Sequence, residues 1–577
     1  MIASMFRIAG LSALIAFATS AHAQDVAPEA ATGHVDKASV TAQKFMIAAA
    51  NPLAAKAGYD ALKQGGSAVD AMVATQMVLG LVEPQSSGLG GGAFLVYHDG
   101  ASNTLTTLDG RETAPLAATS DLFIKPDGTP MKFFDGVVGG RSVGTPGTLK
   151  LMFEAHKRYG KLDWASLLQP AIDLAQNGFA VSPRLAQLIA KDQKRLATYP
   201  DTQAYFFDAA GEPLKVGATL KNPDYANTLR LIAAQGSVVF YKGEIAHDIV
   251  AAVKDAKDNP GLLSTTDLAK YRIIERAPVC VTYRSNKVCG MGPPSSGALT
   301  VGQILGILNH FDIPQPIAQN HHLIAEASRL AFADRGLYMA DSDFVAMPEG
   351  LLDPAYLKSR AALIDPARAA TKVEAGTPPW TSAQVRTPDN AIEFPSTSHM
   401  SIVDGDGNAV SLTTTIENGF GSRVMARGFL LNNELTDFSF IPEKDGKPVA
   451  NRLEPGKRPR SSMSPTIVYG PDGKLKMVVG SPGGSRIIGY VAQTIIGVLD
   501  WNLDVQDAIA QPHIVKRFKT VDIETAPGAE AMATVLTALG HDTKVRDLNS
   551  GLHAIVLSKK GLTGGADPRR EGIVLGD

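Results

Sequence analysis

Apolar positions along the chain follow helical spacing in some segments and strand-like alternation in others, which predicts a mixed α/β protein. Residues 52–64 carry apolar side chains at helical spacing and end at two glycines. Ser67 then begins a second helix as its N-cap, with Asp70 three residues later. The apolar run that follows has no polar face, so we expect this helix to be buried. Residues 148–270 and 321–339 also have helical spacing.

An irregular stretch precedes two strands in the second half of the chain. Residues 365–395 are rich in proline and poor in large apolar groups, which is typical of a poorly ordered connector. Directly after it, residues 400–403 and 409–415 alternate as two strands around the turn 404–407. A connector that runs straight into a hairpin is an unusual boundary, and we predict that the chain is cut there.

The first residues predict a secretory signal. Arg7 provides positive charge, residues 8–18 form a short apolar run, and Ala21-His22-Ala23 has the small-x-small pattern of a cleavage site. The alternative, a membrane anchor, needs a span of about 20 apolar residues, which is longer than this run. We therefore expect residues 1–23 to be removed and the protein to be periplasmic.

Composition narrows the choice of partners. Hydrophobic residues make up 45% and charged residues 19% of the 577 residues, which is typical of a globular protein. The net charge of −2 gives no excess of positive charge. We therefore expect neither a nucleic acid nor, after signal removal, a membrane as partner.

The two cysteines lie in a predicted hairpin. If Arg284 and Ser285 form its turn, Cys280 and Cys289 are equidistant from the turn and face each other across the strands. Directly opposed positions bring the Cα atoms within disulfide range. Two free buried thiols are the alternative, and an oxidising compartment favours the bridge.

Three generic motifs fail on their context. The glycines of residues 88–93 follow a polar turn and precede a strand, whereas a dinucleotide fingerprint needs a strand and then a helix. Residues 140–144 match the nucleophile elbow around Ser142, but Pro146 and Gly147 prevent the immediate helix that an elbow needs. A helical pair, His322 and Glu326, lacks a third metal ligand, so we expect a surface or packing role.

A fourth motif keeps a chemical interpretation. Residues 480–486, GSPGGSR, form a glycine turn that precedes the mostly apolar residues 487–499. A turn that begins a helix directs backbone N–H groups at an anion. No lysine follows the glycines as in a phosphate loop, and an oxyanion hole needs the same N–H donors.

Taken together, these segments resemble the γ-glutamyltransferase family of the N-terminal-nucleophile hydrolase superfamily. The matching stretches occur in the family's order over almost the whole mature chain. They are LDGRETAP (108–115), GPPSSG (292–297), TSHMS (397–401), NNELTDF (432–438), RSSMSPT (460–466) and the glycine turn.

The resemblance implies a four-layer αββα sandwich built by two subunits from one precursor. The large subunit is residues 24–396, with a flexible connector at about 365–396, and the small catalytic subunit is residues 397–577. The cut falls between Ser396 and Thr397. A threonine hydroxyl needs an adjacent base, and the amine freed by the cut has a pKa near 8, so cleavage creates that base.

The resemblance also assigns the site. Thr397 is the nucleophile, Thr415 hydrogen-bonds its amine and hydroxyl region, and Gly483 and Gly484 supply the oxyanion-hole N–H groups. The donor's α-carboxylate is bound by Arg111, Ser461 and Ser462. Its α-ammonium is bound by Glu417, Glu434 and Asp437. Glu417 and Glu434 replace amides of some members, which makes the ammonium pocket more acidic. No cofactor and no metal ion is implied.

The leading prediction is therefore an enzyme that takes a γ-glutamyl group from glutathione or a related compound and passes it, through an ester on Thr397, to water, an amino acid or a peptide. A glutaryl or cephalosporin acylase of the same superfamily would bind a group without the α-ammonium. Two predictions from other classes are a secreted α/β-hydrolase that uses Ser142 and a non-catalytic periplasmic binding protein.

Overall fold

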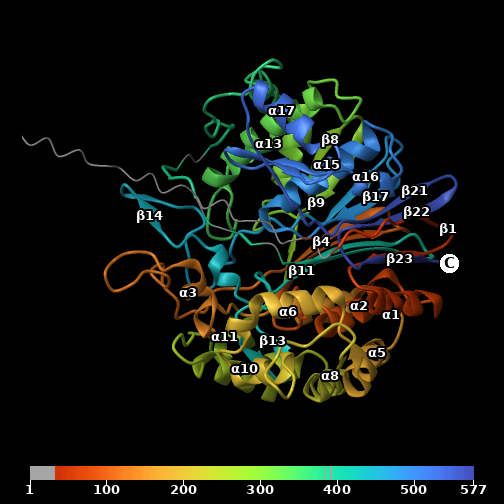
Figure 1. The fold of residues 1–577 in the computed structure, drawn as a ribbon, viewed down its shortest axis with the longest axis vertical. Coiled ribbons are helices and arrows are strands. Elements are labelled where there is room, and N and C mark those ends of the chain that lie inside the picture. Colours follow the sequence, from red (N-terminus) through yellow and green to blue (C-terminus); the bar gives the residue numbers. More distant parts are fainter. Residues whose placement is uncertain (1–30, 32, 382–383, 390, 392, 395) are drawn as a thin grey trace, which may run out of the picture.

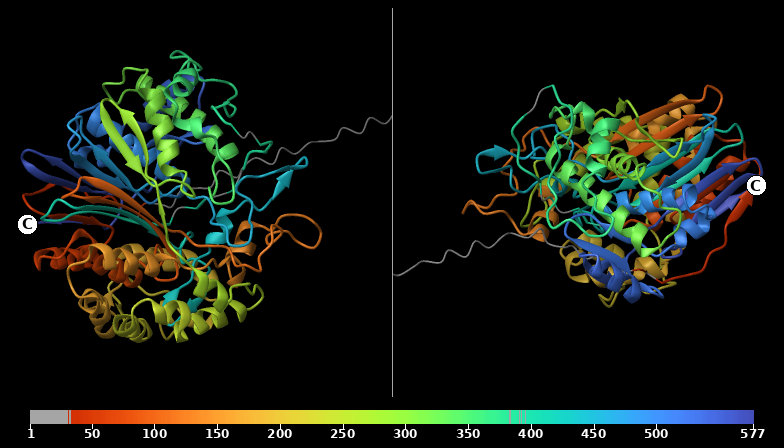
Figure 2. Two further views of the ribbon diagram at one scale, coloured as in Figure 1. Left: turned by 180° about the vertical axis from the view of Figure 1, so that it is seen from behind. Right: turned by 90° about the horizontal axis from the view of Figure 1, so that it is seen from above.

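Two seven-stranded sheets are stacked between two layers of helices (Figures 1 and 2). The computed structural model describes residue 31 and residues 33–577, apart from 382, 383, 390, 392 and 395. The expected secretory segment, residues 1–23, lies outside the described residues. The predicted αββα sandwich is confirmed.

The first sheet mixes strands from both sides of the expected cut. Its antiparallel strands are β23 (Ile573–Gly576), β2 (Met46–Ala49), β10 (Ser398–Val403), β11 (Ala409–Thr415), β3 (Gly92–Asp99), β4 (Thr104–Gly110) and β7 (Ile274–Arg276), in that order. Strand β10 lies between β2 and β11, so backbone hydrogen bonds join the segments before and after residue 397. A cut at that point would therefore leave both pieces in one sheet.

The second sheet also combines the two parts of the chain. Its order is β1 (Val40–Ala42), β22 (Gly561–Ala566), β21 (His553–Ser558), β17 (Leu475–Gly480), β16 (Thr466–Tyr469), β9 (Asn286–Gly290) and β8 (Val279–Tyr283). Side chains of β3 alternate between the two cores that the first sheet separates. Leu95 and Tyr97 pack with the helices below that sheet, whereas Phe94 and Val96 pack with residues of the second sheet.

The helices below the first sheet begin where the sequence predicts. Asn51 caps α1 (Pro52–Lys63), and Ser67 forms a capping box with Asp70 at the start of α2 (Ala68–Val82). Every residue of α2 is buried, as its lack of a polar face predicts. Helices α4 (Thr148–Tyr159), α5 (Trp164–Asn177), α6 (Pro183–Leu196), α8 (Pro223–Gln235) and α10 (Glu244–Lys254) add to this layer (Figure 1).

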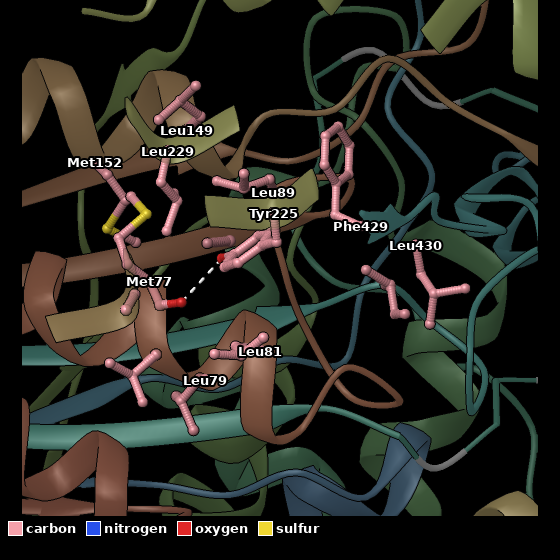
Figure 3. Close-up of a cluster of buried hydrophobic side chains, with 14 of the residues drawn as sticks. Met77, Leu79, Leu81, Leu89, Leu149, Met152, Tyr225, Leu229, Phe429 and Leu430 are labelled. Carbon is pink, nitrogen blue, oxygen red and sulfur yellow. Dashed lines mark hydrogen bonds between the residues drawn. The ribbon is translucent and has the colours of Figure 1, made fainter. Parts of the chain in front are cut away.

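One buried hydrogen bond fixes a tyrosine within the core of this layer. Tyr225 from α8 lies among Met77, Leu149 and Met152 (Figure 3). Its hydroxyl donates to the carbonyl of Met77 at 2.9 Å. The aromatic ring is thus buried without leaving its polar group unpaired.

The second helical layer covers the outer face of the second sheet. It contains α12 (Gly297–Leu308), α13 (Ala318–Tyr338), α15 (Ile487–Leu499), α16 (Val505–Ala510) and α17 (Ala529–Ala538). Within the described part of the chain, no helix has both the length and the apolar character needed to cross a membrane.

The connector is irregular and nevertheless packed. Its described residues form no helix or strand between α14 (Pro354–Ala361) and β10. The Gly376 amide donates to Asp334 at 2.7 Å, and the Tyr338 hydroxyl donates to the Gly376 carbonyl at 2.6 Å. These contacts attach the connector to α13.

The cysteine hairpin has the geometry that its sequence predicts. Arg284 and Ser285 form the turn between β8 and β9, both with positive φ, as a two-residue type I′ turn requires. Cys280 lies directly opposite Cys289, with their Cα atoms 4.1 Å apart, and the structure joins them in a disulfide.

We expect the bridge to stabilise the fold by about 2–3 kcal/mol, because it closes a short loop. Replacing Cys280 and Cys289 together by serine should lower the free energy of unfolding, measured in denaturant, by that amount. Mass spectrometry without reductant should find one hairpin peptide lighter than its reduced form by two hydrogen atoms. Recovery of both thiols in alkylatable form from oxidised protein would contradict the prediction.

Candidate active site

Two threonines face each other at one end of the β10–β11 hairpin. Ser398 pairs with Thr414 across the strands, so the next positions outward are Thr397 and Thr415. Their hydroxyl oxygens are 3.2 Å apart, and both residues are buried. The antiparallel register therefore brings together two hydroxyls that are 18 positions apart in the sequence.

Both hydroxyls are directed at the peptide bond expected to be cut. The Thr397 hydroxyl donates to the Ser396 carbonyl at 2.6 Å, and the Thr415 hydroxyl donates to the same oxygen at 2.9 Å. The amide of Glu417 donates to the Thr415 hydroxyl at 2.9 Å, which fixes its orientation. This arrangement places the hydroxyl that we predict to be the nucleophile beside a carbonyl whose oxygen accepts two hydrogen bonds.

The predicted site residues surround one pocket next to Thr397. All of them except Gly483 and Ser396 line it, and Glu393, Phe394, Met463 and Ile487 complete the lining. The remaining cavity has a volume of about 20 Å³, which is room for about one water molecule. The structure thus brings together residues from six separated stretches of sequence, while their individual roles stay predictions.

The glycine turn has a backbone that other residues rarely adopt. Gly483 and Gly484 have φ of 139° and 58°, and a short helical turn leads from them into α15. A Cβ atom on Gly484 would lie 2.8 Å from the carbonyl oxygens of Glu393 and Phe394. Glycine is therefore required at residue 484 both for its conformation and for the close approach of the connector.

Arg111 lies at the centre of a buried ion-pair cluster. Its guanidinium donates to Glu434, to Asp437 at 2.6 Å, and to the backbone carbonyls of Pro459 and Arg460. Burial raises the pKa of Glu434 and of Asp437, and Arg111 opposes that rise. In this state the arginine contacts two of the acids assigned to the opposite end of the donor.

Among the residues that the structure describes, none forms an ion pair with Glu417. Its carboxylate accepts hydrogen bonds from the Asn433 side chain and, at 3.1 Å, from the Phe394 amide. Burial and the nearby Asp437 raise the pKa of Glu417 well above its ordinary value. The residue also has a φ of 74°, which is uncommon for a residue with a side chain and occurs at functional sites. A cation entering the pocket would favour the charged form of this carboxylate.

The sequence did not indicate Glu393 and Phe394, or Arg335, which lies behind Glu393. Proline content marked the first two only as part of a connector, and Arg335 is one of several charged residues on helix α13. These three residues become visible as part of the site only in the tertiary structure, where the connector lies over the pocket.

Two of the other motifs make packing contacts in the structure. Ser142 is fully buried, and its hydroxyl donates to the Val137 carbonyl at 2.6 Å. His322 contacts His541, and Glu326 pairs with Lys516 at 2.9 Å, so this pair has the packing role that we expected. No cluster of three metal-binding side chains occurs among the described residues.

Comparison with known proteins gives the family. The Gamma-glutamyltranspeptidase family model matches residues 54–576, which is most of the chain. The chain belongs to the γ-glutamyltranspeptidase family. The resemblance found in the sequence is therefore confirmed, and the chain is an enzyme. Family membership excludes the non-catalytic binding protein and the α/β-hydrolase based on Ser142.

Individual γ-glutamyltranspeptidase relatives cover most of this chain. It is 39% identical to the glutathione hydrolase proenzyme of Bacillus subtilis (strain 168) over 81% of this chain and 80% of that protein. It is 37% identical to the glutathione hydrolase proenzyme of Escherichia coli (strain K12) over 92% of this chain and 91% of that protein. The crystal structure of cephalosporin acylase from Bacillus halodurans aligns with a TM-score of 0.82 at 28% identity, covering 96% of this chain and 99% of the acylase.

Proposed function

We propose that this enzyme is a self-processing γ-glutamyltransferase and glutathione hydrolase that uses Thr397 as its nucleophile. The observation that carries the proposal is the contact of the Thr397 hydroxyl with the Ser396 carbonyl, shared with Thr415. The relatives in Bacillus subtilis and Escherichia coli are named glutathione hydrolase proenzymes, which supports both the substrate and the processing.

Self-cleavage proceeds as an acyl shift followed by hydrolysis. The Thr397 oxygen attacks the carbonyl carbon of Ser396, the peptide C–N bond breaks, and the hydroxyl proton moves to the departing nitrogen. Water then hydrolyses the resulting ester, which leaves a carboxylate on Ser396 and restores the Thr397 hydroxyl beside a free amine. The large subunit is then residues 24–396 and the small subunit residues 397–577.

Turnover repeats the same chemistry on a donor. The free Thr397 amine accepts the hydroxyl proton as the oxygen attacks the γ-carbonyl, and that proton passes to the leaving amine. The amides of Gly483 and Gly484 stabilise the oxyanion. Water, an amino acid or a peptide then attacks the γ-glutamyl ester and releases the enzyme. Residues 1–23 direct the precursor to the periplasm.

Donor recognition uses the charged groups around the pocket. The α-carboxylate lies toward Ser461, Ser462 and the remaining N–H of Arg111, and the α-ammonium lies among Glu417, Glu434 and Asp437. Burial raises the pKa of these three acids and so opposes their ionisation. The donor's ammonium favours their charged form. An acylase for glutaryl or cephalosporin groups is the alternative, because the cephalosporin acylase shares this fold. A glutaryl group has no α-ammonium and would not need the three acids.

The direct test is release of an anilide from γ-glutamyl anilide, with and without a dipeptide acceptor. A γ-glutamyltransferase releases the anilide in both conditions and forms a γ-glutamyl dipeptide in the second. Turnover of glutaryl anilide in clear preference to γ-glutamyl anilide would establish the acylase instead.

Arg111→Lys should reduce kcat/KM for γ-glutamyl anilide by about 10- to 150-fold, which corresponds to about 1.5–3 kcal/mol for a charge-assisted contact. Lysine keeps the charge but loses the planar fork, which contacts Glu434 and Asp437 and directs its remaining N–H at the donor. Self-cleavage needs no donor, so the variant should still yield two chains on a denaturing gel. Arg284→Lys, in the β8–β9 turn, is the matched control. Unchanged kinetics for Arg111→Lys would remove Arg111 from donor binding.

A further inference from the structure

A second arginine reaches the carboxylate side of the pocket from helix α13. Arg335 is 2% exposed, and its guanidinium donates to the Ser296 hydroxyl and the Ser462 hydroxyl, both at 2.8 Å. Ser462 itself lines the pocket beside Thr397. Arg335 is therefore one side chain away from the place where the donor's carboxylate is expected.

In the uncleaved chain this arginine already binds a carboxylate. Glu393, four residues before Thr397, is buried and contacts both the Arg335 guanidinium and the Ser462 hydroxyl. Arg460 lies 3.7 Å from the same carboxylate. Burial disfavours the charged form of Glu393. The positive charges of Arg335 and Arg460 outweigh this effect of burial and lower the pKa of Glu393. Glu393 is thus held as an anion at Ser462.

The residue after Glu393 contacts the opposite side of the pocket. The Phe394 amide donates to Glu417, one of the acids assigned to the donor's ammonium, at 3.1 Å. Two adjacent connector residues therefore present a carboxylate to Ser462 and an N–H group to Glu417. An α-amino acid likewise presents a carboxylate and N–H donors, the latter on its ammonium. The cavity of about 20 Å³ left beside the connector is too small for an amino acid.

Arg111 alone cannot offer a free fork to the donor. Four of its five N–H groups are used by Glu434, Asp437 and the carbonyls of Pro459 and Arg460. Arg335 differs, because its only carboxylate partner among the described residues belongs to the connector. When the connector leaves, the buried guanidinium loses that partner, and an uncompensated buried charge requires another anion.

We infer that Arg335 and Ser462 form a carboxylate subsite that Glu393 fills in the uncleaved chain and that the donor's α-carboxylate fills after cleavage. The inference rests on the proposed function and adds to it a binding residue that the family resemblance did not supply. It also gives a reason for the uncleaved chain to exclude donors, because its own connector occupies their place.

The first test compares two donors on processed Arg335→Lys. γ-Glutamyl anilide carries the α-carboxylate, whereas 4-aminobutyryl anilide keeps the ammonium and lacks only that carboxylate. We expect KM for γ-glutamyl anilide to rise about 10-fold or more, as for loss of a charge-assisted contact. We expect kcat/KM for 4-aminobutyryl anilide to change less than about 2-fold. Arg329→Lys, on the same helix and hydrogen-bonded to the connector carbonyl of Ala370, is the matched control.

Equal losses on both donors would overturn the inference, since they would indicate a structural role for Arg335. The proposed function would still stand if the wild type turned over γ-glutamyl anilide, so the two failures are distinguishable.

A second test needs no substitution of Arg335 and decides the case if Arg335→Lys does not process. Phenylglyoxal, which modifies accessible guanidinium groups, is applied to processed wild type, and labelled peptides are identified by mass spectrometry. Arg335 should be labelled, L-glutamate should protect it, and 4-aminobutyrate should not. The exposed Arg230 should be labelled in every sample.

In uncleaved Thr397→Ala, Arg335 should be unlabelled because Glu393 covers it. Equal protection by both ligands, or the absence of labelling after processing, would overturn the inference.

Discussion

Thr397→Ala is expected to remain one uncut chain and to lose activity by at least about 10⁴-fold, the scale seen when a covalent nucleophile is removed. Alanine lacks the hydroxyl that lies 2.6 Å from the Ser396 carbonyl oxygen, so the acyl shift has no nucleophile. Without the cut, residue 397 has no free amine and therefore no base. Both steps thus depend on one side chain, and no partial activity is expected.

Intact mass and anilide release measure the two effects separately. Thr397→Ser keeps the hydroxyl and should still be cut. Thr414→Val is the matched control on β11, because the buried Thr414 hydroxyl has no hydrogen-bond partner among the described residues. If Thr397→Ala shows the two normal fragments, a host protease makes the cut and Thr397 is not the scissile nucleophile.

The strands beside Thr397 and Thr415 were predictable because their sequence signals are local. Alternation in residues 400–403 and 409–415, with the turn between them, predicted the β10–β11 hairpin. The antiparallel register then places Thr397 opposite Thr415. The capping residue Ser67 likewise predicted the start of α2. Each of these features is determined by residues that lie close together in the sequence, so the sequence alone is enough to predict it.

The interior of the pocket was not predictable in the same way. The contacts of Arg111 with Glu434 and Asp437 join positions more than 320 residues apart, and no local spacing relates them. Glu393 was hidden because a proline-rich composition indicates a poorly ordered connector rather than part of a site. The fold places this connector instead over the pocket, where the charge of Glu393 is balanced by Arg335. Long-range ion pairs of this kind require the tertiary structure.

Asp437→Asn separates the transferase from the acylase, and we expect it to reduce kcat/KM for γ-glutamyl anilide by about 100-fold or more. The substitution removes the negative charge that faces the donor's ammonium, a loss of about 1.5–3 kcal/mol. It also removes one of the two carboxylates that hold Arg111, at 2.6 Å, and breaking a buried pair adds to the cost. The two-chain form should persist, because self-cleavage needs no donor.

Glutaryl anilide isolates the ammonium contribution, because it differs from γ-glutamyl anilide only in lacking that group. The disturbed Arg111 affects both substrates, since both carry the carboxylate, whereas the missing charge at residue 437 affects only the substrate with an ammonium. The loss in kcat/KM for γ-glutamyl anilide should therefore exceed the loss for glutaryl anilide by about 10-fold or more. Equal losses would assign Asp437 a structural role, through Arg111, and would remove the main support for recognition of an amino-acid donor. The same result together with a wild-type preference for glutaryl anilide would identify the enzyme as an acylase, because a site that ignores the ammonium has no means of selecting γ-glutamyl compounds.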